Sequence, residues 1–279
     1  MAINWFPGHM NKAKREIAEL MPRIDLIIEI LDARIPFSSE NPLIQKIRGD
    51  TPCLKLLNKS DLAEAAKTKA WMEYFDAQEG VTAIDVTREN PKKVKSSLRK
   101  LRKRLIGKKS RSRPDMMLIL GIPNVGKSTI INTLTGRAIA KTGNKPAVTK
   151  QQQQVRIDQN TILVDTPGFL WPKLDPPECG YRLAVTGAIK DSVVDSTDIA
   201  TFALRYLMTH YSEALQKRYK LQELSPEPLE VLKAIAKKRV CITHGGEIDF
   251  HKVSELLIHE LRQGIIGPLT LELPSDYES

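Results

Sequence analysis

The sequence has 279 residues, of which 41% are hydrophobic and 27% are charged, a composition typical of a folded protein long enough to bury its own core. The formal net charge is +10, from 43 Lys and Arg against 33 Asp and Glu, which favours a polyanionic partner such as nucleic acid. No apolar run is long enough to span a membrane, and the first residues lack a signal-peptide pattern, so we expect a cytoplasmic protein with no membrane partner. Three scattered cysteines exclude a disulfide framework.

The first predicted strand covers residues 26–31, which are nearly continuous in aliphatic side chains. A second apolar run, over residues 53–57, ends in Asn58-Lys59-Ser60-Asp61. This N-K-x-D pattern suits guanine, because the Asp61 carboxylate can accept from two N–H donors of that base, a bidentate pair that adenine cannot form. Asn58 would hold the loop, and the Lys59 stem would lie over the ring. Alone, the tetrapeptide fits an ordinary loop equally well, so its interpretation depends on a phosphate-binding loop elsewhere.

A helix over residues 63–77 and a short strand over residues 81–86 come next. Thr87, at the end of that strand, occupies the place of a third base-contacting loop. From residue 91 to residue 113 the chain is heavily basic, and aliphatic side chains recur at helical spacing, so one helix face packs while the others carry Lys and Arg. Two interpretations stay open: a solvated helix with a flexible connector over residues 108–114, or a contact with nucleic acid, whose phosphates neutralise the like charges.

The motif with the clearest chemistry is Gly121-Ile122-Pro123-Asn124-Val125-Gly126-Lys127-Ser128, which follows an apolar run and fits the phosphate-binding loop pattern G-x-x-x-x-G-K-[ST]. Its glycines let the backbone curl so that N–H groups point at phosphates, and the following helix start adds partial positive charge. Lys127 would reach the β- and γ-phosphates, and Ser128 would offer its hydroxyl to Mg²⁺. The residues expected to bind the nucleotide here are Asn124, Val125, Gly126, Lys127, Ser128 and Thr129.

Two further phosphate-sensing positions follow this loop. Residues 138–154 have the composition of a loop, and in it Thr149 is the residue expected to reach Mg²⁺ and the γ-phosphate. A predicted hairpin, with strands over residues 155–158 and 161–164, then delivers Asp165-Thr166-Pro167-Gly168. In this D-x-x-G motif, Asp165 would hold Mg²⁺ through a water, and the Gly168 N–H would sense the γ-phosphate. All three motifs follow predicted parallel strands, at whose carboxyl ends open α/β sheets bind ligands.

The composition changes after Pro176-Pro177. Helix-like stretches appear near residues 197–210, 228–238 and 250–263, with no convincing series of strands. We therefore predict an α/β domain over residues 1–177, with a mostly parallel sheet flanked by helices. A smaller all-α domain is predicted over residues 178–279.

The order of the motifs is unusual. Most guanine-nucleotide switches carry the phosphate loop first and N-K-x-D last, whereas here N-K-x-D comes first and D-x-x-G last. A sheet keeps its strand neighbours if the chain enters it at another point and the old ends are joined, and the connector over residues 108–114 is well placed to join them. The pattern predicts a P-loop GTPase domain with circularly permuted motif order, whose helical extension follows the element most sensitive to the γ-phosphate.

Several segments, taken together and in this order, are highly specific for one family of proteins. They are Trp5-Phe6-Pro7-Gly8-His9-Met10, Asp32-Ala33-Arg34-Ile35-Pro36, Asn58-Lys59-Ser60-Asp61, the phosphate loop, Asp165-Thr166-Pro167-Gly168, Leu170-Trp171-Pro172-Lys173 and Arg182-Leu183-Ala184-Val185-Thr186-Gly187-Ala188-Ile189-Lys190-Asp191. With them, the chain resembles the circularly permuted GTPases of the YlqF family over essentially its full length. The resemblance implies GTP hydrolysis, with GTP, GDP and Mg²⁺ bound, coupled to late assembly of the large ribosomal subunit. The implied partner is the precursor of that subunit, with its rRNA and ribosomal proteins. We expect the protein to be a monomer, and the resemblance implies that its C-terminal helical domain helps to bind the precursor.

The resemblance carries two catalytic expectations. Phe169 stands where many relatives place a water-orienting Gln, so intrinsic hydrolysis should be slow, and the family suggests His9 as the residue that orients or activates the water. Asn124 matches the Asn of potassium-stimulated relatives, whose side-chain oxygen helps to hold K⁺ near the phosphates; alternatively, Asn124 only shapes the loop. Thr87 departs from the small Ser or Ala usual in the family at this position. Thr149 is the last residue of the sequence Pro-Ala-Val-Thr in its loop, where Pro-Gly-Val-Thr is commoner in the family.

A different class of function also fits these features. An RNA-binding scaffold that uses GTP mainly as a structural ligand would suit Phe169 and the basic segment over residues 91–113. A mitochondrial or tRNA-directed GTPase with similar motif order is disfavoured, because the N-terminus does not resemble a transit peptide.

Overall fold

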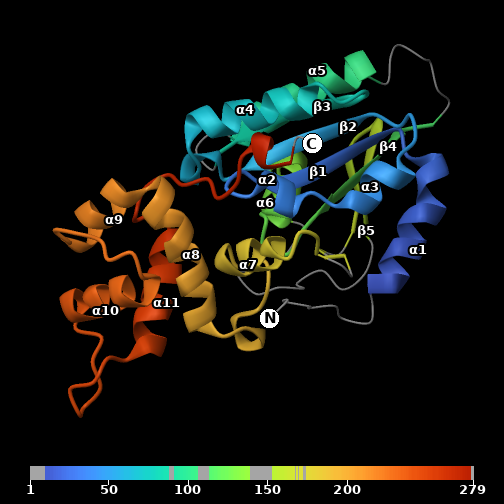
Figure 1. Ribbon diagram of the computed structural model, residues 1–279. Helices are drawn as coiled ribbons and strands as arrows, with labels where there is room; N and C mark the ends of the chain where they lie inside the picture. Colours follow the sequence, from blue (N-terminus) through green and yellow to red (C-terminus); the bar gives the residue numbers. More distant parts are fainter. Residues whose placement is uncertain are drawn as a thin grey trace.

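The computed structural model describes residues 10–87, 91–105, 113–138, 153–166, 168, 170–171 and 174–277. At its centre is a sheet of six strands in the order β3-β2-β1-β4-β6-β5 (Figure 1). Five of these strands are parallel, and β5 is antiparallel to β6 at one edge. The strands are β1 (Leu26–Asp32), β2 (Cys53–Asn58), β3 (Val81–Val86), β4 (Asp115–Gly121), β5 (Gln153–Asp158) and β6 (Thr161–Asp165).

The three central strands are buried along their whole length, as their continuous aliphatic sequences predict. Their register aligns their ends: Asp32 pairs with Asn58 across β1 and β2, and Ile119 pairs with Asp165 across β4 and β6. The predicted strands and the β5–β6 hairpin are therefore confirmed. The carboxyl ends of β1, β2, β4 and β6 meet at one edge of the sheet.

Helices cover both faces of this sheet. They are α1 (Met10–Leu20), α2 (Pro36–Ser39), α3 (Pro42–Ile47), α4 (Ala65–Asp76), α5 (Pro91–Leu105) and α6 (Lys127–Thr135). Right-handed crossovers place α3 and α4 on one face and α5 and α6 on the other, since the chain reverses its direction across the sheet after β3. In agreement, α5 packs against α6, and the Lys55 ammonium lies over the Phe75 ring of α4.

The chain beyond residue 177 is helical. It contains α7 (Glu178–Val185), α8 (Ser196–His210), α9 (Ser212–Tyr219), α10 (Pro228–Arg239) and α11 (Phe250–Arg262). The three longer helices match the predicted stretches, whereas the eight-residue helices α7 and α9 were not predicted. In Figure 1, α8 to α11 gather at one side of the sheet, away from α5. Within the described residues, no helix is long and apolar enough to cross a bilayer.

The last described residues return from the helical part to the sheet, and Figure 1 shows the C-terminus there. The Leu269 N–H donates to the Leu62 carbonyl at 2.9 Å, and the Leu271 N–H donates to the Arg34 carbonyl at 2.8 Å. The boundary expected near residue 177 stays a prediction. The structure adds that the helical part is tied to the sheet at both of its ends.

Glu272 anchors this returning segment. Its buried carboxylate accepts from the Ser38 N–H at 2.9 Å, the Ser38 hydroxyl at 2.6 Å and the Tyr277 hydroxyl at 3.1 Å. Its carbonyl accepts from the indole N–H of Trp71 at 3.1 Å. Burial raises the pKa of the Glu272 carboxyl, and Arg182 at 3.7 Å, together with the Ser38 and Tyr277 donors, opposes that rise.

We predict that Glu272→Ala lowers the free energy of unfolding by about 3 kcal/mol, because it leaves buried donors and a nearby guanidinium without their acceptor. Urea denaturation measures this loss. Glu247→Ala, which truncates an exposed glutamate, is the control and should change stability by less than about 0.5 kcal/mol. Equal unfolding midpoints for the two variants would contradict the anchoring role.

Candidate nucleotide-binding site

The phosphate-loop motif connects β4 to α6. Gly126 precedes the helix with a left-handed φ of 99°, and a Cβ added to it would lie 2.3 Å from the Asn58 amide nitrogen. Glycine is therefore required here for both its conformation and its size. Asn124 also has a positive φ, of 60°, which asparagine tolerates better than most residues.

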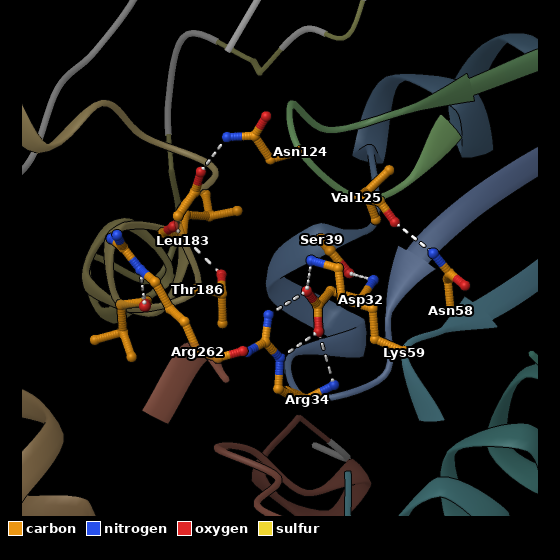
Figure 2. Close-up of polar contacts among 12 residues, drawn as sticks. Asp32, Arg34, Ser39, Asn58, Lys59, Asn124, Val125, Leu183, Thr186 and Arg262 are labelled. Atoms are coloured by element: carbon orange, nitrogen blue, oxygen red, sulfur yellow. Dashed lines mark hydrogen bonds and ion pairs between the residues drawn. The ribbon is translucent and has the colours of Figure 1, made fainter. Parts of the chain in front are cut away.

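The base-recognition motif touches this loop directly. The Asn58 amide donates to the Val125 carbonyl at 2.7 Å, and both residues are buried (Figure 2). The N-K-x-D motif on β2 and the phosphate loop after β4 thus form one continuous structure, although 67 positions separate the bonded residues.

The D-x-x-G motif meets the phosphate loop on its other side. Lys127 and Asp165 form a buried ion pair, and the Thr166 hydroxyl donates to the Ile119 carbonyl at 3.1 Å. Burial lowers the pKa of Lys127 and raises that of Asp165, while their mutual attraction opposes both shifts. Gly168 lies against the Pro123 backbone.

The residues present fit a phosphate chain and a hard cation. Lys127 and Asp165 are 7% and 3% exposed, and among the described residues each of these buried charges forms an ion pair only with the other. A polyphosphate and a divalent cation would give each of them a partner of opposite charge. Ser128, half-buried in the first turn of α6, and the Asp165 carboxylate are oxygen donors of the kind that Mg²⁺ prefers.

Lys59 is held by a buried charge cluster. Its ammonium lies 2.9 Å from the Asp32 carboxylate, which also accepts from Arg34 Nε at 2.9 Å and from the other arm of that guanidinium at 2.8 Å (Figure 2). Burial alone would raise the pKa of Asp32, but the two cations hold that pKa well below its usual range. The Asp32 carboxylate therefore stays ionised and holds the Lys59 ammonium. The Lys59 backbone is in the left-handed region, with a φ of 60°.

The remaining predicted base-contacting residues follow the neighbouring strands β2 and β3. Asp61 is exposed, in the turn after β2, and Thr87 directly follows β3. The Ser60 hydroxyl donates to the Val86 carbonyl at 3.0 Å and so joins the two loops. The Asp61 carboxylate and the end of β3 are therefore held on adjoining loops, where both can contact a guanine base.

The helical part contacts the phosphate loop and the segment that follows β1. The Asn124 amide donates to the Gly187 carbonyl, just after α7, at 2.8 Å, and Arg34 donates to the Arg262 carbonyl at 3.4 Å. Figure 2 shows Asn124 pointing toward the end of α7 and Arg34 toward Arg262. A cavity of about 730 Å³ lies between the two parts, lined by residues that include Arg34, Lys59, Asn124, Lys190 and Arg262.

The structure thus brings together most of the predicted site, while the functional roles of these residues stay predictions. Thr129 is exposed on the first turn of α6, next to Ser128. His9 and Thr149 lie outside the described residues. Asp32 belongs to a segment that carries the resemblance, but no role in the site was predicted for it, although a carboxylate at the carboxyl end of a strand is a recognisable signal. Nothing in the sequence marked Arg262 as a neighbour of Arg34, which is 228 positions away.

Comparisons with known proteins agree with this geometry. A family model described as 50S ribosome-binding GTPase matches residues 116–241, and one described as RsgA GTPase matches residues 40–175. Ribosome biogenesis GTPase A of Bacillus cereus is 44% identical over 99% of this chain and 96% of its own length. The protein of that name from Thermotoga maritima is 30% identical over 98% of this chain and 95% of its own length.

Solved structures show the same similarity. A GDP-bound YlqF structure aligns with a TM-score of 0.68 and 28% identity, covering 94% of this chain and 100% of that one. A GNP-bound YlqF from T. maritima aligns with a TM-score of 0.65 and 28% identity over 94% of this chain and 98% of that one. These findings confirm the resemblance and the α/β fold predicted from the motifs. The chain therefore belongs to the ribosome biogenesis GTPase A (YlqF) family and is a GTPase involved in ribosome biogenesis.

Proposed function

We propose that this GTPase binds the precursor of the large ribosomal subunit and promotes its late assembly, with nucleotide state controlling the association. The observation that carries the proposal is the junction of the helical part with the phosphate loop, through Asn124–Gly187, and with the charge cluster beside the base loop, through Arg34–Arg262. A GTPase built in this way can pass a change at the phosphates to a second surface within one or two contacts. The names of the relatives support a ribosomal partner.

In the proposed reaction, water attacks the γ-phosphate of GTP and the bond to the β-phosphate oxygen breaks. Lys127 exchanges Asp165 for phosphate oxygens and stabilises the charge that develops on them. Bound Mg²⁺ supplies further positive charge to the β- and γ-phosphates, and Ser128, Thr149 and Asp165 are the residues proposed to hold it. The Gly168 N–H donates to the γ-phosphate. His9 orients the water, since Phe169 has no side-chain group that can do so.

A scaffold with negligible turnover is the second candidate, and the basic composition of α5 favours it. GTP turnover with and without the large-subunit precursor separates the two. We expect the particle to stimulate turnover, and we expect His9→Ala to reduce the stimulated rate by about 100-fold, the size of a typical acid–base contribution. The nucleotide affinity of this variant should be unchanged. The scaffold would be favoured if the particle left turnover unchanged and if His9→Ala turned over GTP at the same rate as the wild type.

Guanine recognition by Asp61 generates a second prediction. Asp61→Asn should weaken GTP binding by about 10- to 100-fold, because a charge-assisted pair is lost, and should improve XTP binding relative to GTP, because the new amide can donate to the xanthine oxygen. Competition binding with both nucleotides measures the ratio. Asp50→Asn, an exposed aspartate just before β2 at the opposite edge of the sheet, is the control. Equal losses for GTP and XTP would place the base elsewhere.

The proposed K⁺ role of Asn124 can be separated from its contact with Gly187. The side-chain oxygen would ligate K⁺, whereas the nitrogen donates to Gly187. We therefore expect wild-type turnover to fall when Na⁺ replaces K⁺ and Asn124→Ala to lose this dependence. Asn124→Asp, which keeps an oxygen but loses the donor, should retain it. Steady-state rates at saturating GTP in each salt test this prediction, and a wild-type rate that is indifferent to the cation would refute it.

A further inference from the structure

The helix α5 is unusually basic. Its 15 residues include eight Lys and Arg and no Asp or Glu. Like charges three or four positions apart destabilise a helix, and basic residues in its first turn oppose the helix dipole. The charge pattern therefore costs helix stability.

Part of this charge is used by the fold. Lys93 pairs with Asp85 at 2.5 Å, Arg102 pairs with Asp115 at 2.7 Å, and Arg104 donates to the Thr82 hydroxyl at 2.9 Å. These contacts dock α5 on the sheet, where its Val94 and Leu98 side chains are buried. They account for three of the eight basic residues.

Four other basic residues of α5 differ from these three. Lys95, Arg99, Lys100 and Lys103 are exposed, and in the described part of the chain none of them has an acidic partner. Lys95, Arg99 and Lys103 follow one another at intervals of four, so they form a line about 12 Å long at 1.5 Å per residue. We call these four residues the exposed basic face.

We propose that the exposed basic face binds the phosphate backbone of double-helical RNA without regard to sequence. Recognition of single strands uses aromatic side chains on which bases stack, and α5 contains none. An acidic membrane surface needs apolar side chains facing the lipid as well as charge, and Val94 and Leu98 are turned into the protein. A line of cations without stacking groups suits phosphates held at the regular spacing of a duplex.

The position of α5 makes this a second contact surface. In Figure 1 it lies well away from α8 to α11, the part of the chain expected to bind the ribosomal particle. RNA bound on α5 would therefore be a different segment from any bound by the helical part. This inference relies on the proposed function only in taking the RNA from the ribosomal precursor.

The test uses a triple variant, Lys95→Gln, Arg99→Gln and Lys103→Gln, with a short mixed-sequence RNA duplex as the probe. We expect its affinity at low salt to fall at least about tenfold, and the slope of log K against log salt to become shallower by about 2 to 3, as three phosphate contacts are lost. The control triple is Lys46→Gln, Lys69→Gln and Arg156→Gln, three exposed and scattered positions. Both triple variants lower the formal net charge of +10 by three, and only the first should bind the RNA duplex more weakly.

Equal losses in the two triples would overturn the proposal, because only net charge would matter. Tighter binding of a single strand of the same composition, or comparable binding to vesicles of anionic lipid, would also overturn it. GTP turnover without RNA should be unchanged in both triples. Absence of turnover in the wild type would contradict the proposed function, whereas normal turnover with undiminished RNA binding in the α5 triple would contradict this inference alone.

Discussion

The hydrogen bond between the Asn58 amide and the Val125 carbonyl is the contact on which the nucleotide site depends. It joins the loop that would read the base to the loop that would cradle the phosphates, so one ligand can reach both. The bond forms only because Gly126 has no side chain, since a Cβ there would lie 2.3 Å from the amide nitrogen. The second glycine of the phosphate-loop pattern therefore has two functions in this chain: it allows the turn, and it admits the neighbouring motif.

The permuted order of the motifs does not change this arrangement, because the site is built from strand neighbours and not from chain order. Residues 26–30 of β1 pair in parallel with residues 117–121 of β4, which joins the half that carries N-K-x-D to the half that carries the phosphate loop. Residues 115–119 of β4 pair in turn with β6, which carries D-x-x-G. The same three strand ends meet wherever the chain enters the sheet. What permutation changes is the element that follows D-x-x-G, here the helical part of the chain.

Much of this structure could be predicted from the sequence because its signals are local. Continuous aliphatic runs define the central strands, and short motifs at their ends define the phosphate and base loops. The rest depends on contacts between distant residues. Arg34 reaches Arg262, and Glu272 reaches Ser38, through the return of the tail, for which hydrophobic periodicity carries no information. Asp32 lies between these cases: its place at a strand end was visible, but its pairing with Lys59 was not.

The strength of each contact indicates where the molecule can move. The Asp32–Arg34–Lys59 cluster is almost fully buried, and removing one partner from such a cluster costs about 3 to 5 kcal/mol, so it belongs to the permanent framework. The contact of Arg262 with Asp191 is different, because the Asp191 side chain is 72% exposed and such pairs contribute at most about 1 kcal/mol. The same guanidinium donates to the carbonyls of Ala184 and Val185 at the end of α7, next to the turn whose Gly187 carbonyl accepts from Asn124. The phosphate loop therefore meets the helical part through the hydrogen bond from Asn124 to the Gly187 carbonyl, at a turn that an exposed ion pair supports, while the base loop is braced by buried charge. A displacement of the helical part relative to the nucleotide site therefore costs least at the Gly187 turn, while the Asn58–Val125 hydrogen bond keeps the phosphate loop and the base loop together.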